Sequence, residues 1–495
     1  MVTRIHSRHS TGARGAAGAM LRSQGERMSK VDTAWLRMDC PSNLMMITGV
    51  LTLKPGVAYE ELCERVQERL LQYSRFRQRV VQDVAGASWV DDGDFDIHRH
   101  VVREKLPRNR KGGEQAALQQ RVGELAMQPL DFEHPLWQFH LVEHYEGGSA
   151  LLARIHHCIA DGIALIAVVL SLVDGGAAPP PRSRKQPPSG VEDWISQTLI
   201  KPLTEMTVKA LGAAGDGAAK SMSMLRDPHK GLEGGVDFAK LAYQVLGDAA
   251  ALALMPDDSN TRLKGQPGMA KRVAWCQPIP LDEVKAVSKA LNCSINDVLL
   301  SCVGGAIGGY LKALGDDVAG QEIRAMIPVN LRPLDQAHKL GNRFGLVPLV
   351  LPIGMENPIE RVYEIRRRMS ALKGSTQPLL AFGLLAVAGL LPKAGQEALL
   401  RLFGTKTTAV MTNVPGPREK LKLLGATLEQ CMFWVPQSGD IGLGVSILSY
   451  GGGVQFGVIT DTQLCPDPQK IIDEFEPEFA RLSLVTLMLP WDEPG

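Results

Sequence analysis

Apolar positions along the chain follow two periods, and together they predict alternating strands and helices. In residues 59–73, Leu62, Val66, Leu70 and Leu71 recur at helical spacing on one face. Short apolar runs bounded by turn residues instead predict strands. We expect strands at residues 45–53, 139–144, 150–156, 323–329, 346–351, 408–412, 442–449 and 453–460, and further helices at 194–225, 238–254, 281–291 and 296–314. This alternation predicts two α/β lobes of similar size.

A Pro- and Gly-rich segment separates the two predicted lobes. Residues 177–190 have the composition of an extended linker. A chain of 495 residues also exceeds what one hydrophobic core usually holds. We therefore predict an N-terminal lobe at residues 29–176, a helical connecting segment at 191–269 and a C-terminal lobe at 270–490.

The first 28 residues are basic and contain little that can form a core. Five arginines stand here among Ser, Gly and Ala, which predicts a disordered leader at residues 1–28. A transit peptide and translation from Met20 or Met28 remain alternatives.

Composition excludes several classes of function. The formal net charge of +1 gives no global field for binding nucleic acid. The eight cysteines are scattered singly and lack the close spacing of a zinc site or a dithiol site. No secretory signal is evident, so we expect a reduced, cytoplasmic setting.

The most apolar run, at residues 379–391, is shorter than the roughly 20 residues that a spanning helix needs. We predict no transmembrane span. The run is either a buried helix or a surface helix that enters a bilayer or lines a lipid channel.

Two adjacent histidines stand at the end of a predicted strand. The apolar segment 150–156 leads directly into His156 and His157, and Asp161 and Gly162 follow before a new apolar helix. A tight loop fixed between a strand and a helix is a good platform for a site. Asp161 can cap the helix or hold an arginine, and Gly162 permits unusual backbone geometry. By themselves, two histidines are more often incidental strand-end residues.

His-His-x-x-x-Asp-Gly is the motif of the CoA-dependent acyltransferase superfamily, and further segments resemble its bacterial wax ester synthase/diacylglycerol acyltransferase family. The similarity extends from about residue 29 to about residue 490, in a fixed order. The matching segments are residues 130–137 with Pro-Leu-Trp, 296–300 with Asn-Asp, 327–332, 341–345 and 413–417 with Asn-Val-Pro-Gly-Pro. One departure is Pro41-Ser42-Asn43-Leu44-Met45-Met46, where the family commonly has Pro-Met-His. The resemblance implies that this departure affects the acceptor pocket and leaves the proposed catalytic residues unchanged.

The resemblance implies two chloramphenicol-acetyltransferase-like lobes with mixed sheets and an active-site tunnel between them. It implies an O-acyltransferase that moves a fatty acyl group from acyl-CoA to a long-chain alcohol or a diacylglycerol, giving wax ester or triacylglycerol. Acyl-CoA would be a substrate, with no metal or other cofactor. Partners would be these lipids and the surface of the inner membrane or of lipid inclusions. The resemblance does not determine the oligomeric state.

The resemblance also assigns roles to single residues. His157 would be the general base, His156 a supporting residue, and Asp161 a structural residue paired with Arg332 or Arg154. Substrate-binding or site-supporting roles would fall to Trp137, Asn296, Asp297, Arg332 and Asn413. From the residues themselves, Trp137 is more often a packing residue, and Asn296 is equally well a helix N-cap.

Histidine suits the base because its unperturbed pKa of about 6.5 leaves an unprotonated ring available near neutral pH. No nucleophile elbow is evident, so we expect direct attack by the alcohol on the thioester. A Cys158 nucleophile is the alternative, but alternation along an extended strand would turn its thiol away. Candidate oxyanion donors are Ser446, Ser449 and Thr412.

Two other functions fit the same sequence. One is a condensation-type acyltransferase that uses carrier-protein thioesters, and the other is a non-catalytic binder of lipid surfaces.

Overall fold

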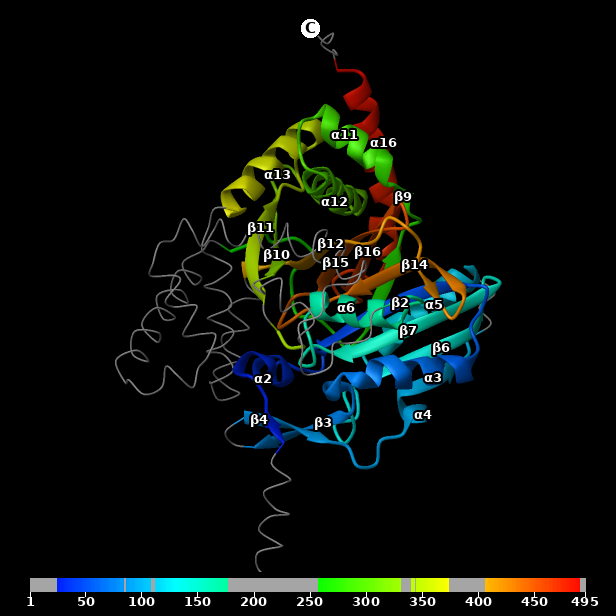
Figure 1. Ribbon diagram of the computed structural model, residues 1–495. Helices are drawn as coiled ribbons and strands as arrows, with labels where there is room; N and C mark the ends of the chain where they lie inside the picture. Colours follow the sequence, from blue (N-terminus) through cyan, green and yellow to red (C-terminus); the bar gives the residue numbers. More distant parts are fainter. Residues whose placement is uncertain are drawn as a thin grey trace, which may run out of the picture.

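The computed structural model describes residues 25–83, 86–107, 112–176, 257–330, 340–342, 344–373 and 406–489 (Figure 1). The predicted linker, the predicted helices at 194–225 and 238–254, the apolar run at 379–391 and Arg332 lie outside these ranges.

One lobe is built on a six-stranded mixed sheet with the order β13-β14-β2-β7-β6-β5. Neighbouring strands are antiparallel except β5 and β6, which are parallel. All nine residues of β7 are buried, as expected of a strand covered on both faces. The strands are β2 (Met46–Lys54), β5 (Val101–Glu104), β6 (Trp137–Tyr145), β7 (Gly148–His156), β13 (Lys422–Leu423) and β14 (Ala426–Trp434).

The second lobe is built on a seven-stranded mixed sheet. Its order is β11-β10-β12-β15-β16-β8, and β9 also pairs with β16. The pairs β10–β12 and β12–β15 are parallel, and the others are antiparallel. The strands are β8 (Lys271–Trp275), β9 (Ile279–Pro280), β10 (Ile323–Asn330), β11 (Phe344–Leu351), β12 (Ala409–Pro415), β15 (Leu443–Tyr450) and β16 (Gly453–Asp461).

The C-terminal part of the chain contributes two strands to the first lobe, which the predicted division at residue 270 misses. β13 and β14 belong to the C-terminal part of the sequence but complete the first sheet, where β14 pairs with β2 from Thr427↔Lys54 to Trp434↔Thr48. The apolar pattern did not predict a strand at residues 426–434, and periodicity by itself does not say which sheet a strand joins. A shared core lies between the lobes, and the rings of Trp275 and Trp434 meet in it at 5.8 Å.

A small sheet corrects the predicted boundary of the basic leader. It has the order β1-β4-β3, with β1 (Glu26–Arg27), β3 (Gln78–Asp83) and β4 (Gly86–Asp91). The Arg27 guanidinium donates to Asp83, and the Met28 side chain is buried. Residues 26–28 therefore belong to the fold and not to a disordered segment.

Helices cover the sheets, with α11, α12, α13 and α16 gathered at one end of the second lobe (Figure 1). The predicted helix at 59–73 ends at Arg69 and continues as two 3-10 turns, η1 (Leu70–Gln72) and η2 (Ser74–Phe76). The helices are α2 (Lys30–Arg37), α3 (Tyr59–Arg69), α4 (Ile97–His100), α5 (Gly113–Leu125), α6 (Gly162–Leu172), α11 (Leu281–Ala290), α12 (Ile295–Ala313), α13 (Pro358–Lys373) and α16 (Gln469–Leu487).

Glycines let α12 approach its neighbours closely. A Cβ atom on Gly308 would lie 2.2 Å from the carbonyl oxygen of Ile353, so only glycine fits there. Within the described residues, no single helix is long and apolar enough to cross a membrane. Only α11 and α12 together meet those criteria, and they are bent by 101° at their junction.

Candidate active site

The His-His segment connects the middle of the first sheet to a helix. His156 is the last residue of β7, and α6 begins at Gly162. The Asp161 carboxylate accepts a hydrogen bond from Ala164 N at 2.9 Å and so caps α6, as an aspartate N-cap does. His157 N donates to Met45 O at 2.7 Å, which holds the loop against the residue preceding β2.

His157 is a buried base between aromatic rings. Its side chain is 3% exposed, and its ring lies on the indole of Trp35, with ring centroids 4.2 Å apart and planes inclined by 17°. The ring of Phe344 lies 5.5 Å away, inclined by 49°. Burial lowers the pKa of His157 to about 4, although the nearby Asp161 charge acts in the opposite direction. The imidazole is therefore unprotonated near neutral pH, as a general base requires.

A buried carboxylate holds the backbone of this loop. Asn342 Nδ2 donates to His157 O at 2.7 Å and to Asp32 Oδ1 at 2.8 Å. Asn342 N also donates to Asp32 Oδ1, at 3.0 Å. The guanidinium of Arg75 donates to Asp32 Oδ2 at 3.3 Å and to Ile159 O at 2.8 Å. These three side chains, here called the clamp, fix two carbonyl groups on either side of Cys158.

His156 supports the site from a separate set of contacts. Its Nε2 lies 3.3 Å from Asp39 Oδ2, and its Nδ1 accepts from Cys158 N at 3.1 Å. Burial alone lowers the pKa of His156, but Cys158 and Asp39 outweigh burial and raise the pKa. The bond from the Cys158 amide requires an unprotonated Nδ1. The geometry therefore holds a neutral ring with its proton on Nε2, despite the raised pKa.

Cys158 does not follow the expected strand alternation. Residues 157–159 form a turn, and the Cys158 thiol interacts with His156. The side chain is 0% exposed, so the thiol is not available as a nucleophile in this conformation.

The segment that departs from the family pattern joins the histidine loop to the other lobe. Asp39 Oδ1 accepts from Met45 N at 2.5 Å, which closes the turn that contains Asn43. Asn43 Nδ2 donates to Gly439 O at 2.6 Å and to Ile441 O at 3.3 Å, and Asn43 Oδ1 accepts from Lys271 Nζ at 2.5 Å. Burial lowers the pKa of Lys271 to about 8, opposed by the charge of Asp461.

The structure tests the proposed partner of Asp161 only in part. Arg332 is outside the described residues. Arg154 is not the partner, because its guanidinium donates to Gln138 Oε1, Gln128 O and Met46 Sδ. It lies on β7 two residues before His156, within the sheet, and not at the helix start.

Gly162 does not have the backbone role predicted for it. Its φ is not among the positive values in the chain, and a Cβ atom there would meet no described atom within 4 Å. The prediction of special loop geometry at Gly162 is therefore wrong: the residue is an ordinary first residue of α6.

Trp137 packs in the core of the first lobe. Its side chain is 1% exposed, its Nε1 donates to Phe76 O at 2.9 Å, and its ring lies on His100 at 4.5 Å. These contacts favour the packing role over a role at a tunnel wall.

Asn296, Asp297 and Asn413 come together in the second lobe. Ser294, and not Asn296, is the N-cap of α12, and it forms a capping box with Asp297. Asn413 Nδ2 on β12 donates to Asn296 Oδ1 at 2.9 Å. The three residues thus fix the start of α12 against β12, and none of their described hydrogen bonds reaches His157.

Two of the three candidate oxyanion donors lie across from each other on neighbouring strands. Thr412 on β12 and Ser446 on β15 are in register. Thr412 Oγ1 donates to Val445 O at 3.4 Å, whereas Ser446 Oγ has no hydrogen-bond partner among the described residues. Ser449 lies further along β15, opposite Pro415. Their predicted role stays a prediction.

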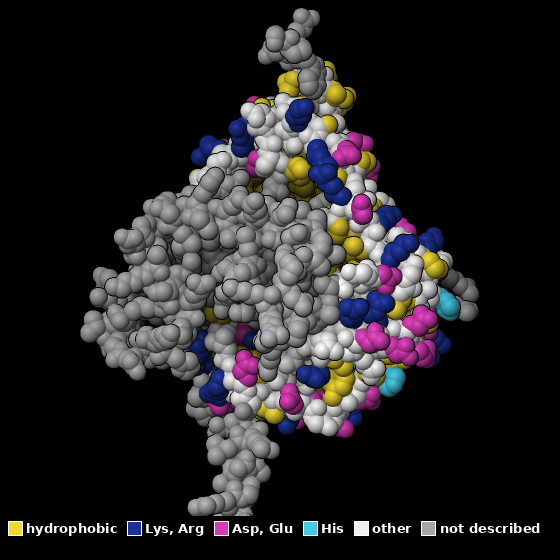
Figure 2. All heavy atoms as spheres, viewed as in Figure 1, with side chains coloured by type: hydrophobic (Ala, Val, Ile, Leu, Met, Phe, Trp, Pro, Cys, Tyr) yellow, Lys and Arg dark blue, Asp and Glu magenta, His cyan; other side chains and the backbone are white. Residues whose placement is uncertain are grey.

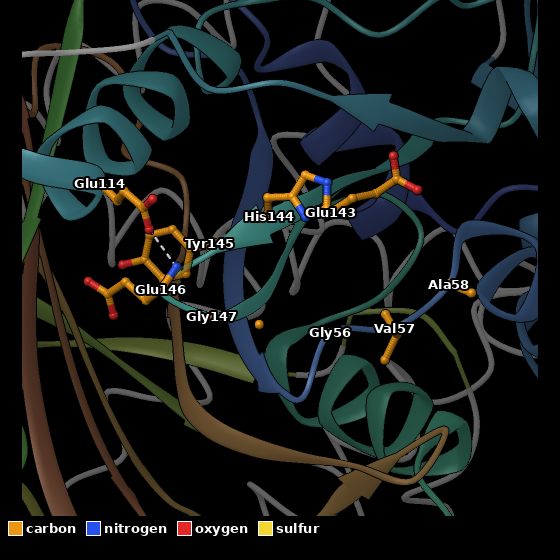
Figure 3. A pocket seen from close by; sticks show the side chains of 10 residues that line it. Gly56, Val57, Ala58, Glu114, Glu143, His144, Tyr145, Glu146 and Gly147 are labelled. Atoms are coloured by element: carbon orange, nitrogen blue, oxygen red, sulfur yellow. Dashed lines mark hydrogen bonds between the residues drawn. The ribbon is translucent and has the colours of Figure 1, made fainter.

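A cavity of about 500 Å³ lies at the far end of β7 from His157 (Figure 3). It surrounds the turn between β6 and β7, and its lining includes Glu114, Glu143, His144 and Glu146. Seven buried residues of β7 separate Gly148 from His156, so this cavity does not adjoin the histidine loop. Among the described residues, no group of three or more His, Cys, Asp or Glu side chains is arranged to hold a metal ion.

Sequence comparisons place the chain among lipid acyltransferases. Residues 28–299 match the wax ester synthase/diacylglycerol acyltransferase catalytic domain, and residues 340–483 match the WS/DGAT C-terminal domain. A Mycobacterium tuberculosis protein described as a probable diacylglycerol O-acyltransferase, tgs1, is 27% identical over 470 residues, which cover 93% of this chain and 96% of that protein. A second one, tgs2, is 26% identical, covering 90% and 96%.

Solved structures share the fold. The wax ester synthase/diacylglycerol acyltransferase from Marinobacter aquaeolei VT8 superposes with a TM-score of 0.63 at 21% identity, covering 93% of this chain and 99% of that one. The first condensation domain of the CDA synthetase gives a TM-score of 0.55 at 14% identity, covering 93% and 96%. The predicted two-lobe α/β fold with mixed sheets is confirmed.

Proposed function

Because the chain belongs to the wax ester synthase/diacylglycerol acyltransferase family, and is therefore an acyltransferase, we propose that His157 is the general base of its reaction. The proposed reaction transfers a fatty acyl group from acyl-CoA to the hydroxyl of a long-chain alcohol or a diacylglycerol. The observation that carries this proposal is the buried imidazole of His157, whose backbone carbonyl is held by the clamp and whose ring lies on Trp35.

The proposed steps use only this base and the two substrates. The hydroxyl oxygen attacks the thioester carbonyl carbon while its proton passes to the imidazole of His157. The tetrahedral intermediate then releases the CoA thiolate, which takes the proton back from the imidazolium. The transfer forms the ester C–O bond, breaks the thioester C–S bond and moves the proton from the hydroxyl through His157 to the thiolate. These steps use no metal ion and no redox group.

The surroundings of His157 support a base of this kind. Burial keeps the ring neutral and excludes bulk water, while the Asp161 charge favours the protonated form that arises during the reaction. A fixed carbonyl on each side of Cys158 leaves the loop little freedom. Such preorganisation aligns a base with its proton donor at no further cost during reaction.

We further propose that the protein works at a lipid surface, because both proposed substrates carry long acyl or alkyl chains. The end of α16 offers an apolar surface for this purpose. Leu484, Leu487 and Met488 are 61%, 65% and 76% exposed, and their spacing puts them on one side of the helix. Figure 2 shows apolar side chains at this end of the molecule, where α16 projects beyond the second lobe.

The deciding experiment measures release of free CoA thiol from palmitoyl-CoA, with hexadecanol or a diacylglycerol as acceptor. Wild type is compared with His157→Ala and with His144→Ala, a control on the exposed hairpin at the far end of β7. Chromatography identifies the ester that forms. We expect acceptor-dependent release in wild type and His144→Ala, and a loss of roughly 1,000-fold or more in His157→Ala.

Other outcomes contradict the proposal. Activity retained in a folded His157→Ala variant would exclude His157 as the base. A folded wild type that is inactive with both acceptors but active with a carrier-protein thioester would favour condensation-type chemistry. A wild type that turns over none of these substrates but binds lipid vesicles would favour the non-catalytic role.

A further inference from the structure

Helix α2 contributes two neighbouring supports to the histidine loop. Asp32 and Trp35 are three residues apart, so they project from the same side of the helix. Asp32 holds the backbone of the loop through Asn342, and Trp35 lies against the side chain of His157. Ser29 caps this helix, and the six residues from Val31 to Leu36 are buried, so α2 is anchored along most of its length.

The contact between Trp35 and His157 is nearly a parallel stack. The ring centroids are 4.2 Å apart and the planes are inclined by 17°, so the face of the indole covers the face of the imidazole. Trp35 is 5% exposed, and Phe344 packs beside both rings, 5.6 Å from the indole and 5.5 Å from the imidazole. A ring enclosed in this way cannot turn out of its plane without displacing two aromatic neighbours.

The imidazole changes its charge during the proposed reaction, and this changes the strength of its attraction to the indole face. The neutral ring becomes a cation when it accepts the hydroxyl proton. The face of an aromatic ring carries partial negative charge and attracts a cation lying over it, and tryptophan does so most strongly. Burial opposes this cation, while the charge of Asp161 favours it.

We propose that Trp35 is a positioning residue for His157: its indole face fixes the plane of the imidazole and stabilises the positive charge that this ring gains in the transition state. The inference rests on the proposed role of His157 as the base. It assigns a role to a residue in the first turns of the fold, about 120 positions before the histidine. If Trp35 served packing alone, the rate would respond only to changes in the shape of the indole. In the proposed role, the rate also responds to the electron density of the indole face.

The test varies the electron density of the indole without changing its shape. Fluorine atoms added to a tryptophan ring withdraw density from its face and weaken attraction to a cation in proportion to their number. Because the chain has seven tryptophans, fluorinated analogues are incorporated at codon 35 alone by stop-codon suppression. The control series carries the same analogues at Trp434, which is 1% exposed and packs on Trp275 in the shared core. The readout is the single-turnover rate of acyl transfer at saturating acceptor.

We expect the logarithm of this rate to fall in proportion to the number of fluorines at position 35. The total loss should be roughly 2- to 30-fold, the range that corresponds to one cation–π contact. The rate should not change along the Trp434 series. Equal rates throughout the position 35 series would overturn the proposal.

The failure of this proposal is distinguishable from failure of the proposed function. If His157→Ala is inactive while fluorination at position 35 has no effect, His157 remains the base and Trp35 is only a packing residue. If His157→Ala is active, the proposed function itself fails. Trp35→Leu adds a second measure, because it removes both the stack and the charge effect and should reduce the rate more than full fluorination does.

Discussion

Asn342 donates a hydrogen bond to the carbonyl oxygen of His157 at 2.7 Å, although 185 residues separate them in the chain. The same side chain reaches Asp32, 310 residues away. The loop that carries the proposed base is therefore held by side chains that lie far apart in the sequence, Asp32 and Arg75 before it and Asn342 after it. The following predictions test these long-range supports.

Replacing Asn342 by Ala should reduce both stability and activity. The change removes donors to His157 O and Asp32 Oδ1 and leaves two buried acceptors with fewer bonds. We expect the free energy of unfolding to fall by about 1–3 kcal/mol, and kcat to fall by roughly 10- to 100-fold because the base is misplaced. Urea unfolding and thiol release measure the two effects. Asn357→Ala, which removes an exposed cap of α13, should leave kcat unchanged; an equal kcat in both variants would contradict the role of the clamp.

Replacing Asp32 by Asn tests the charge in the clamp. Asp32 is 1% exposed in its side chain and faces Arg75, which is 15% exposed. The amide keeps the size and one acceptor but leaves the guanidinium without its anion, so we expect a loss of about 3 kcal/mol in the free energy of unfolding. The matched control is Glu356→Gln in the exposed pair with Lys312, which should cost less than about 1 kcal/mol. Similar losses in the two variants would show that burial of the Asp32 charge has no special weight.

The pH dependence of stability should carry the signature of His157. Its folded pKa of about 4 lies below the unfolded value of about 6.5, so the unfolded chain binds more protons between these pH values. Its contribution to stability is therefore complete above about pH 6.5 and is lost as the pH falls toward 4. His157→Phe keeps an aromatic ring between Trp35 and Phe344 but cannot titrate. Between about pH 4 and 6.5, this variant should take up as much as one proton fewer than wild type when it unfolds. The uptake is obtained from the free energy of unfolding, measured by urea unfolding at several pH values. If the free energy of unfolding changes equally with pH in the two proteins, His157 is not a buried neutral residue.

Replacing Asn43 by Ala should weaken the connection between the lobes. Three hydrogen bonds are lost, from Asn43 to Gly439 O and Ile441 O and from Lys271 Nζ to Asn43 Oδ1. We expect a loss of about 1–3 kcal/mol in the free energy of unfolding, because buried partners remain unpaired. A fall in kcat should accompany it, since Met45 in the same turn holds His157 N. If stability falls and kcat does not, Asn43 joins the lobes without positioning the base.

Substitution by Ala should affect stability at one glycine and not at another. Gly308→Ala puts a Cβ atom 2.2 Å from Ile353 O, so we expect a loss of about 1–3 kcal/mol from overpacking. Gly162→Ala meets no described atom within 4 Å, so its free energy of unfolding should stay within about 0.5 kcal/mol of wild type. Thermal unfolding of both variants measures the difference. A strong loss of stability in Gly162→Ala would restore the predicted backbone role.

The sequence by itself determined the local features of this protein. The apolar run 150–156 followed by His156, His157 and Asp161 predicted the strand, the loop and the capped helix start, and the structure has all three. Strand and helix positions in both lobes agree within a few residues because hydrophobic period and capping act between near neighbours. At the start of α12, the alternative of an Asn296 cap is wrong, because Ser294, two positions earlier, is the N-cap.

Only the tertiary structure decided what surrounds the proposed base. Trp35, Asp32 and Asp39 lie outside the segments that resemble the family, and Asn342 lies in the matching segment 341–345, but nothing in that segment pointed to His157. The burial of Asp32, unusual for an aspartate in a helix, is seen only in the folded chain. The place of β14 in the first sheet was equally hidden, because the apolar pattern did not predict this strand and local periodicity does not choose a strand's partner. Periodicity determines which face of an element is buried, but the partner that buries it depends on how the whole chain closes. The motif therefore predicted the base, and only the folded chain showed which groups hold the histidine loop.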